Sequence, residues 1–200
     1  MNSVYTGLAI SRQFPASRPP DLTARNGWPA PQVPGNFTPM NTCFSFRITA
    51  LPRSEFAPLF GLAERELARR GVRRVLVDSK PGFPCRISLA DAEPGENVIL
   101  LPFTHHAVDS PYRASGPIFV REQAMEAVLS AGEVPEAVRR RLLSVRAYDR
   151  DGMMIDGEVT RGGELEACIE KFFADPRVDR LHLHNAKPGC YLCAVERISG

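Results

Sequence analysis

Short strand-like runs, separated by turn residues, restrict the fold of this sequence more than any other feature. Phe44, Phe46 and Ile48 alternate with polar residues, which is the period-two pattern of a strand with one buried face. Comparable runs follow at 72–77, 85–89, 98–103, 118–120, 143–148, 153–159, 180–184 and 190–198. Because these runs do not alternate regularly with helices, we expect an α+β fold, a largely antiparallel sheet with a few short helices packed on it.

Helical patterns are few and short. They predict helices at 54–60, 63–70, from Pro135 to about residue 142, and at 164–174. The last helix has one apolar face, formed by Leu165, Cys168, Ile169 and Phe172. Asp151-Gly152 and Lys187-Pro188-Gly189 each separate two strand-like runs, so we predict a β-hairpin at each of them.

The chain changes character near Met40. Residues 1–39 contain seven prolines and little apolar periodicity, which predicts a disordered arm. Residues 40–200 have the length and apolar content of a single α+β domain. The change raises the hypothesis that translation starts at Met40.

Charge and cysteine content narrow the functional classes. The net charge of +2 comes from residues 1–39, and the rest carries 22 basic and 22 acidic residues. We therefore expect neither a nucleic-acid nor a membrane partner. The longest apolar run, 190–195, is too short to cross a bilayer, and residues 1–14 lack an export signal. Five cysteines, an odd number, favour free thiols in the cytoplasm.

The densest group of reactive side chains lies at 182–193. If 185–189 is the hairpin loop, His184 faces Cys190 directly, and His182 points to the same side of the sheet. Cys193 points to the opposite side and is a poorer ligand. A thiol beside an imidazole can be a nucleophile, and two imidazoles with a thiolate can bind a metal ion. The alternative is that these side chains simply pack within the sheet.

Other candidates lie outside this group. Cys85 and Arg86 follow a stiff Pro81-Gly82-Phe83-Pro84 turn, although Cys85 could equally be a buried apolar residue. His105 and His106 follow a strand, and since neighbours on a strand point in opposite directions, we prefer only His106. Either Cys85 or His106 could be a fourth metal ligand.

Arginines on or beside strands could bind an anion if two of them converge, or could simply face solvent. They are Arg86, Arg113, Arg121 and Arg146. We count Arg113, Arg146, His106 and the loop residue Asn185 as candidate ligand-binding residues. Successive helical residues point about 100° apart, so we expect that the three arginines at 139–141 cannot converge on one anion and most simply face solvent.

Common enzyme signatures are missing from the sequence. It contains no Gly-x-Gly-x-x-Gly, no phosphate-binding loop, no Gly-x-Ser-x-Gly and no His-Glu-x-x-His. Nucleotide-binding, hydrolase and metalloprotease functions of these kinds therefore lose support.

Four sequence blocks together resemble one known family. The blocks are 78–86 (DSKPGFPCR), 110–121 (SPYRASGPIFVR), 146–149 (RAYD) and 184–191 (HNAKPGCY). In this order they are similar to the bacterial domain-of-unknown-function family numbered 1203, over about residues 44–197. The resemblance implies one domain and assigns no activity, cofactor or substrate.

Three functional hypotheses remain open. The first is a binding domain or enzyme for a small anionic molecule, with Cys190, His184, Cys85 and Arg86 as catalytic residues and Arg146 in the pocket. The second is a metal site made by His182, His184 and Cys190. The third is a non-enzymatic protein-interaction domain, favoured by the many proline, glycine and aromatic residues in the blocks. The sequence identifies no cofactor.

Overall fold

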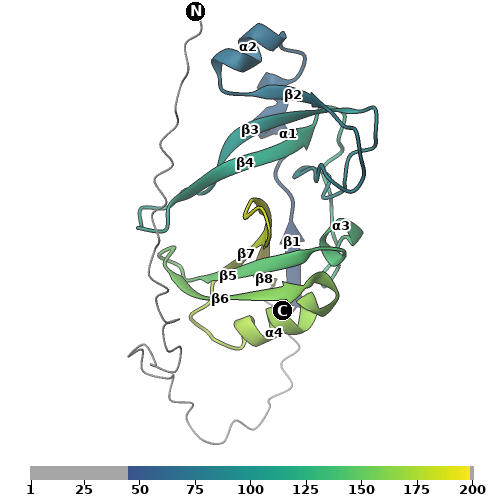
Figure 1. Cartoon of the computed structure of the whole chain (residues 1–200). Coiled ribbons are helices and arrows are strands. Elements are labelled where there is room, and N and C mark those ends of the chain that lie inside the picture. Colours follow the sequence, from purple (N-terminus) through teal and green to yellow (C-terminus); the bar gives the residue numbers. More distant parts are fainter. Residues whose placement is uncertain (1–44, 199–200) are drawn as a thin grey trace, which may run out of the picture. The chain divides into compact units, whose positions relative to one another are not determined.

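Two antiparallel sheets form the part of the chain that the computed structural model describes, residues 45–198 (Figure 1). The strands are β1 (Ser45–Thr49), β2 (Arg73–Leu76), β3 (Asn97–His106), β4 (Ala114–Arg121), β5 (Leu142–Tyr148), β6 (Met154–Arg161), β7 (Arg180–Asn185) and β8 (Tyr191–Ile198). The larger sheet has the order β1-β8-β7-β5-β6, and the smaller sheet has the order β2-β3-β4.

The helices are short. They are α1 (Arg53–Phe56), the 3₁₀ turn η1 (Ala57–Leu59), α2 (Glu64–Arg69), α3 (Glu136–Arg139), the 3₁₀ turn η2 (Gly162–Glu164) and α4 (Leu165–Phe173). The predicted α+β fold is confirmed, with its strands divided between two sheets. Within residues 45–198, no helix is long and apolar enough to span a membrane. The predicted arm (1–39) and the Met40 start lie outside the described residues.

The larger sheet buries one face under α4. The predicted apolar face of this helix is confirmed, since Leu165, Cys168, Ile169 and Phe172 are all buried. They pack against alternate residues of the central strands, including Val145 on β5 and Leu183 on β7. The apolar residues at every second position of the strands therefore pack in one core with the apolar face of the helix.

The smaller sheet has its own core. Phe56 of α1 and Leu67 of α2 pack with Ile99 of β3 and Val120 of β4. The strand predicted at 85–89 is wrong, because this segment forms only isolated bridges. The chain turns back within it: the Cys85 N–H donates to the Ala90 carbonyl, and Leu89 has a φ of 50°. An extended conformation cannot accommodate that turn.

Candidate functional site

The β7–β8 hairpin carries four of the nine predicted site residues, His182, His184, Asn185 and Cys190. Its two strands are adjacent and antiparallel, as predicted, and Gly189 in the loop has a φ of 75°. The predicted pairing of His184 with Cys190 is wrong, since His184 pairs with Tyr191. The register shifts at this point because Leu192 is an extra residue on β8, as in a β-bulge, so Cys190 instead lies opposite Asn185.

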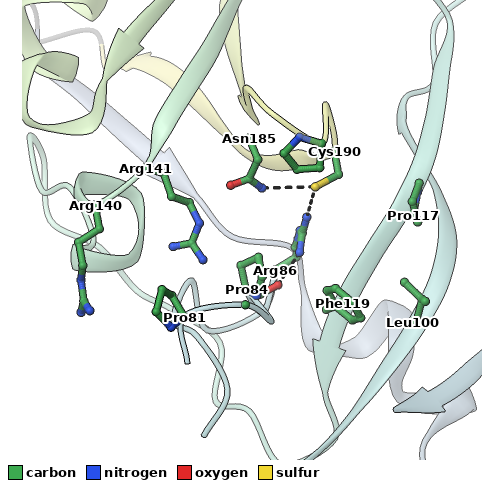
Figure 2. A pocket seen from close by; sticks show the side chains of 12 residues that line it. Pro81, Pro84, Arg86, Leu100, Pro117, Phe119, Arg140, Arg141, Asn185 and Cys190 are labelled. Atoms are coloured by element: carbon green, nitrogen blue, oxygen red, sulfur yellow. Dashed lines mark hydrogen bonds between the residues drawn. The ribbon is translucent and has the colours of Figure 1, made fainter. Parts of the chain in front are cut away.

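Cys190 is held by a guanidinium and an amide. Arg86 Nη2 donates to the Cys190 Sγ at 3.3 Å, and Asn185 Nδ2 donates to the same sulfur at 3.4 Å. Figure 2 shows both side chains directed at the sulfur. Three of the predicted site residues, Arg86, Asn185 and Cys190, are therefore brought together, while the imidazole of His184 is not among the sulfur's hydrogen-bond partners.

Arg86 is the unusual member of this group, because its side chain has 0% exposure. Its Nε donates to the Tyr191 carbonyl at 2.8 Å, and Nη1 donates to the Pro84 carbonyl. Burial lowers the pKa of Arg86, and negative charge on Cys190 opposes that shift. Within residues 45–198, no carboxylate forms an ion pair with Arg86. A buried cation without a counter-ion is costly, so this environment favours an anion at or beside the sulfur.

These three residues line a pocket of about 560 Å³, a size typical of small-molecule sites. Most of its other walls are apolar, formed by Pro81, Pro84, Leu100, Pro117, Phe119 and Pro188. Both sheets contribute to the walls. Leu100 on β3 and Phe119 on β4 come from the smaller sheet, and Asn185 on β7 comes from the larger sheet. Arg140 and Arg141 complete the wall, and Figure 2 shows them on the side away from Leu100 and Pro117.

Arg140 and Arg141 were missed by the sequence interpretation. The expected solvent-facing helical run at 139–141 is wrong for Arg141, whose side chain is 14% exposed and paired with buried Asp91. The helix ends at Arg139, so its 100° spacing does not apply to the two residues that follow. The helix was predicted to reach about residue 142, but β5 begins at Leu142, so Arg140 and Arg141 lie between the two elements.

Three other predicted residues lie outside the pocket. Cys85 is fully buried in the smaller core, where its Sγ accepts a hydrogen bond from the Arg121 N–H at 3.3 Å. Arg113 is exposed, with its Nη1 on the Val108 carbonyl at 3.4 Å. Arg146 lies on β5 opposite His182 and does not line the pocket.

The four histidines of the chain form a separate group with two tyrosines, which we call the histidine cluster: His105, His106, His182, His184, Tyr148 and Tyr191. The ring centroids of His106 and His182 are 5.1 Å apart, and His105 stacks on Tyr191 at 5.2 Å. The opposite orientation expected for neighbours on a strand does not hold for His105 and His106, since both contact the other histidines of the cluster. A register shift between Phe103 and His106 breaks the alternation.

Burial keeps His105, His182 and His184 neutral at pH 7. It lowers the pKa of His182 to about 3 and the pKa values of His105 and His184 to about 4. His184 Nδ1 donates to the Gly189 carbonyl at 3.0 Å, so Nε2 carries the lone pair in the neutral ring. Neither this Nε2 nor His182 Nδ1 has a hydrogen-bond partner in the described part of the chain.

The donor set predicted for a metal ion is not assembled. Across residues 45–198, no three histidine, cysteine, aspartate or glutamate side chains are positioned to hold one ion. His182 and His184 belong to the histidine cluster, whereas the Cys190 sulfur contacts Arg86 and Asn185. The geometry that the structure does provide is a thiol beside a buried cation.

Comparison with known proteins adds a family and no activity. No curated protein and no solved structure matches the chain. A family model described as a protein of unknown function (DUF1203) matches residues 82–197, more than half of the chain. The match includes Arg86, Arg141, Asn185 and Cys190, and it begins later than the resemblance suggested. The chain belongs to this family, DUF1203.

Proposed function

We propose that this protein binds a small anionic molecule in the pocket and that Cys190 is the nucleophile of a reaction on it. The observation that carries the proposal is buried Arg86, which has no carboxylate partner among residues 45–198 and donates to the Cys190 sulfur. The thiolate is the reactive form of cysteine, and a neighbouring cation favours it.

Each side chain has a distinct role in this proposal. Cys190, partly exposed on the pocket wall, attacks an electrophilic atom of the ligand with the electron pair of its thiolate, and the group displaced from that atom leaves with the pair of the broken bond. Arg86 stabilises the anionic sulfur, and Asn185 orients it through the amide N–H. Arg140 and Arg141 supply positive charge for the anionic group of the ligand, while the proline and phenylalanine walls contact its apolar part.

The reaction needs a reduced thiol, and we therefore place the protein in the reducing cytosol of a bacterium as part of the proposal. Four described cysteines, Cys85, Cys168, Cys190 and Cys193, are free thiols. Three of them are buried, and burial raises the pKa of Cys168 to about 11 and of Cys193 to about 12. These buried thiols are expected to be inert, which leaves Cys190 as the described cysteine that can react.

Two alkylating reagents that differ only in charge test both halves of the proposal. The full chain is treated at pH 7 with iodoacetate or iodoacetamide, and mass spectrometry of peptides follows each cysteine separately. We expect Cys190 to react faster than free cysteine with both reagents. We also expect its iodoacetate-to-iodoacetamide rate ratio to exceed that of free cysteine by about tenfold, because the pocket concentrates anions.

Three substitutions serve as controls. Arg86→Met should reduce both rates at Cys190 towards those of free cysteine, whereas Arg86→Lys keeps the charge and should retain part of the effect. Arg113→Gln removes an exposed arginine outside the pocket and should change neither rate. Circular dichroism establishes that each variant is folded. If wild-type Cys190 alkylates no faster than free cysteine, the nucleophile is wrong, and an unchanged rate ratio rules out the anion site.

A further inference from the structure

The histidine cluster joins the two sheets. His105 and His106 come from β3 of the smaller sheet, whereas His182 and His184 come from β7 of the larger sheet. His105 and His184 have ring centroids 5.0 Å apart, and His106 lies 4.1 Å from the ring of Tyr148 on β5. The contact between the sheets at this point is therefore made largely by imidazole side chains, which gain a positive charge when they are protonated.

No negative charge inside the cluster compensates for such a gain. The other titratable or charged groups that act on it are Arg86, Tyr112, Arg146, Arg180, Cys193 and Glu196. Glu196, the one carboxylate among them, is exposed and acts on Tyr191. The arginines act on the imidazoles directly and oppose their protonation.

The hydrogen bonding of His184 and His182 also suits neutral imidazole rings. His106 Nε2 donates to the Gly152 carbonyl at 2.9 Å, and His184 Nδ1 donates to the Gly189 carbonyl. A proton added at His184 Nε2 or His182 Nδ1 would have no acceptor among residues 45–198. A buried cation of this kind is unfavourable, and a second one nearby adds repulsion.

We propose that the histidine cluster is an acid-sensitive switch, in which protonation of the imidazoles separates the two sheets and opens the pocket beside Cys190. The pocket depends on the contact because its walls come from both sheets, and because Arg86 is held by the carbonyl of Tyr191, whose ring belongs to the cluster. The expectation that Cys190 loses its reactivity in acid rests on the proposed function. The expectation that the two sheets separate in acid does not rest on it.

The direction follows from where the imidazoles bind protons. Exposed to solvent, His105, His182 and His184 take up protons near the ordinary pKa of 6.5, and in the closed state burial lowers their pKa values to about 4, 3 and 4. Acidification below pH 6.5 therefore favours the open state. Above that pH both states are neutral, and the sheets stay together.

Tyrosine circular dichroism tests the switch, because two of the four tyrosines of the chain, Tyr148 and Tyr191, lie in the cluster. We expect the near-ultraviolet signal of the full chain to change reversibly between pH 6.5 and 4, at a higher pH than the far-ultraviolet signal. His182→Phe keeps an aromatic ring that cannot be protonated. It should move the midpoint down by about half a pH unit or more.

His182→Gln is a second neutral replacement, used if the phenylalanine variant does not fold. Lys187→His is the matched control, because it adds a histidine in the exposed hairpin loop and should leave the midpoint unchanged. Equal midpoints in wild type and both His182 variants would overturn the switch, as would simultaneous loss of both signals. Cys190 reactivity is not part of this readout, so an inert Cys190 with a normal transition would refute only the proposed function.

Discussion

Cys85 and Arg86 are neighbours in the chain that serve different parts of the molecule. The Cys85 side chain packs in the smaller core, whereas the Arg86 side chain reaches the larger sheet, where it contacts Tyr191 and Cys190. Arg141 lies close enough to oppose the positive charge of Arg86, and its own charge is balanced by Asp91. The arrangement of the pocket wall therefore depends on a carboxylate that does not line it.

Asp91→Asn should destabilise the protein by about 3 kcal/mol, because it leaves the largely buried Arg141 guanidinium without its counter-ion. Glu136→Gln is the matched control, since it frees the other pocket arginine, Arg140, from an exposed pair. Its cost should be below about 1 kcal/mol. Urea denaturation at pH 7 measures both values. Equal costs for the two variants would show that Asp91 does not balance a buried charge.

The sequence identified Arg86, Asn185 and Cys190 as candidates but could not predict that they meet. A stiff proline-rich turn and a hairpin loop each marked a positioned side chain. The contact between Arg86 and Cys190 joins residues 104 positions apart, and no local pattern encodes such a distance. Cys85 and Arg113 have the same residue types as the members of the pocket, and only tertiary packing separates them from it.

At the scale of elements, two tight turns position the cluster and the pocket. Gly152, in the β5–β6 turn, has a φ of 75°, and its carbonyl accepts hydrogen bonds from His106 and Ser110. Gly189, in the β7–β8 turn, has the same φ, and its carbonyl accepts from His184. Each glycine therefore fixes one histidine through its backbone.

Replacing each glycine by alanine separates backbone strain from steric conflict. At Gly189 an added Cβ has no neighbour within 4 Å, so Gly189→Ala should cost about 1 kcal/mol from the left-handed conformation alone. At Gly152 the added Cβ would lie 2.8 Å from Val108 Cγ1, and the cost should rise to about 2–3 kcal/mol. Urea denaturation of both variants measures the difference.

A double substitution checks the assigned cause. Val108→Gly removes the Cβ and both Cγ methyl groups that the new Cβ would meet, so combining it with Gly152→Ala should recover about 1 kcal/mol relative to the sum of the single changes. Strict additivity would mean that Val108 is not the source of the conflict.

Elements were easier to predict than their registers. The β5–β6 and β7–β8 hairpins, and the buried face of α4, followed from apolar periodicity and turn residues. The bulge at Leu192 did not, because Leu192 and Cys193 are both apolar and both enter the larger core. A pattern of apolar residues cannot reveal which of two adjacent residues lacks a partner on the neighbouring strand. Because Leu192 is the residue without a partner, His184 faces Tyr191 and not Cys190.

On the scale of the whole molecule, the two apolar cores are joined by a polar contact. Each sheet buries its own apolar face, one under α4 and the other under α1 and α2. Between them lie the histidine cluster and the side chain of Arg86. Apolar burial depends little on pH, so the pH dependence of stability should originate in this contact.

Protonation of the buried histidines sets the sign and the size of this pH dependence. His182 and His184 are 4% and 0% exposed, and burial holds their pKa values at about 3 and 4, below the ordinary 6.5. Between those limits the unfolded chain binds protons that the folded protein does not, so stability falls as the pH falls. Each pH unit below 6.5 should cost about 1.4 kcal/mol for each imidazole, or about 4 kcal/mol for both at pH 5.

Carboxylates affect the free energy of unfolding in a more acidic pH range, so their contribution can be separated from that of the histidines. Partners lower the pKa values of Glu96 and Asp175 from 4.5 and 3.8, so their stabilisation is present above those values and is lost only in more acidic solution. Urea denaturation at pH 7.5, 6.5, 5.8 and 5.0 should therefore give a free energy of unfolding that falls by less than about 1 kcal/mol between the first two values and more steeply below them. With His182→Phe the slope between pH 6.5 and 5.0 should be smaller by about one proton. A free energy that stays constant down to pH 5 would mean that the imidazoles bind protons equally well in the folded protein, and the cluster would then have no role in its response to acid.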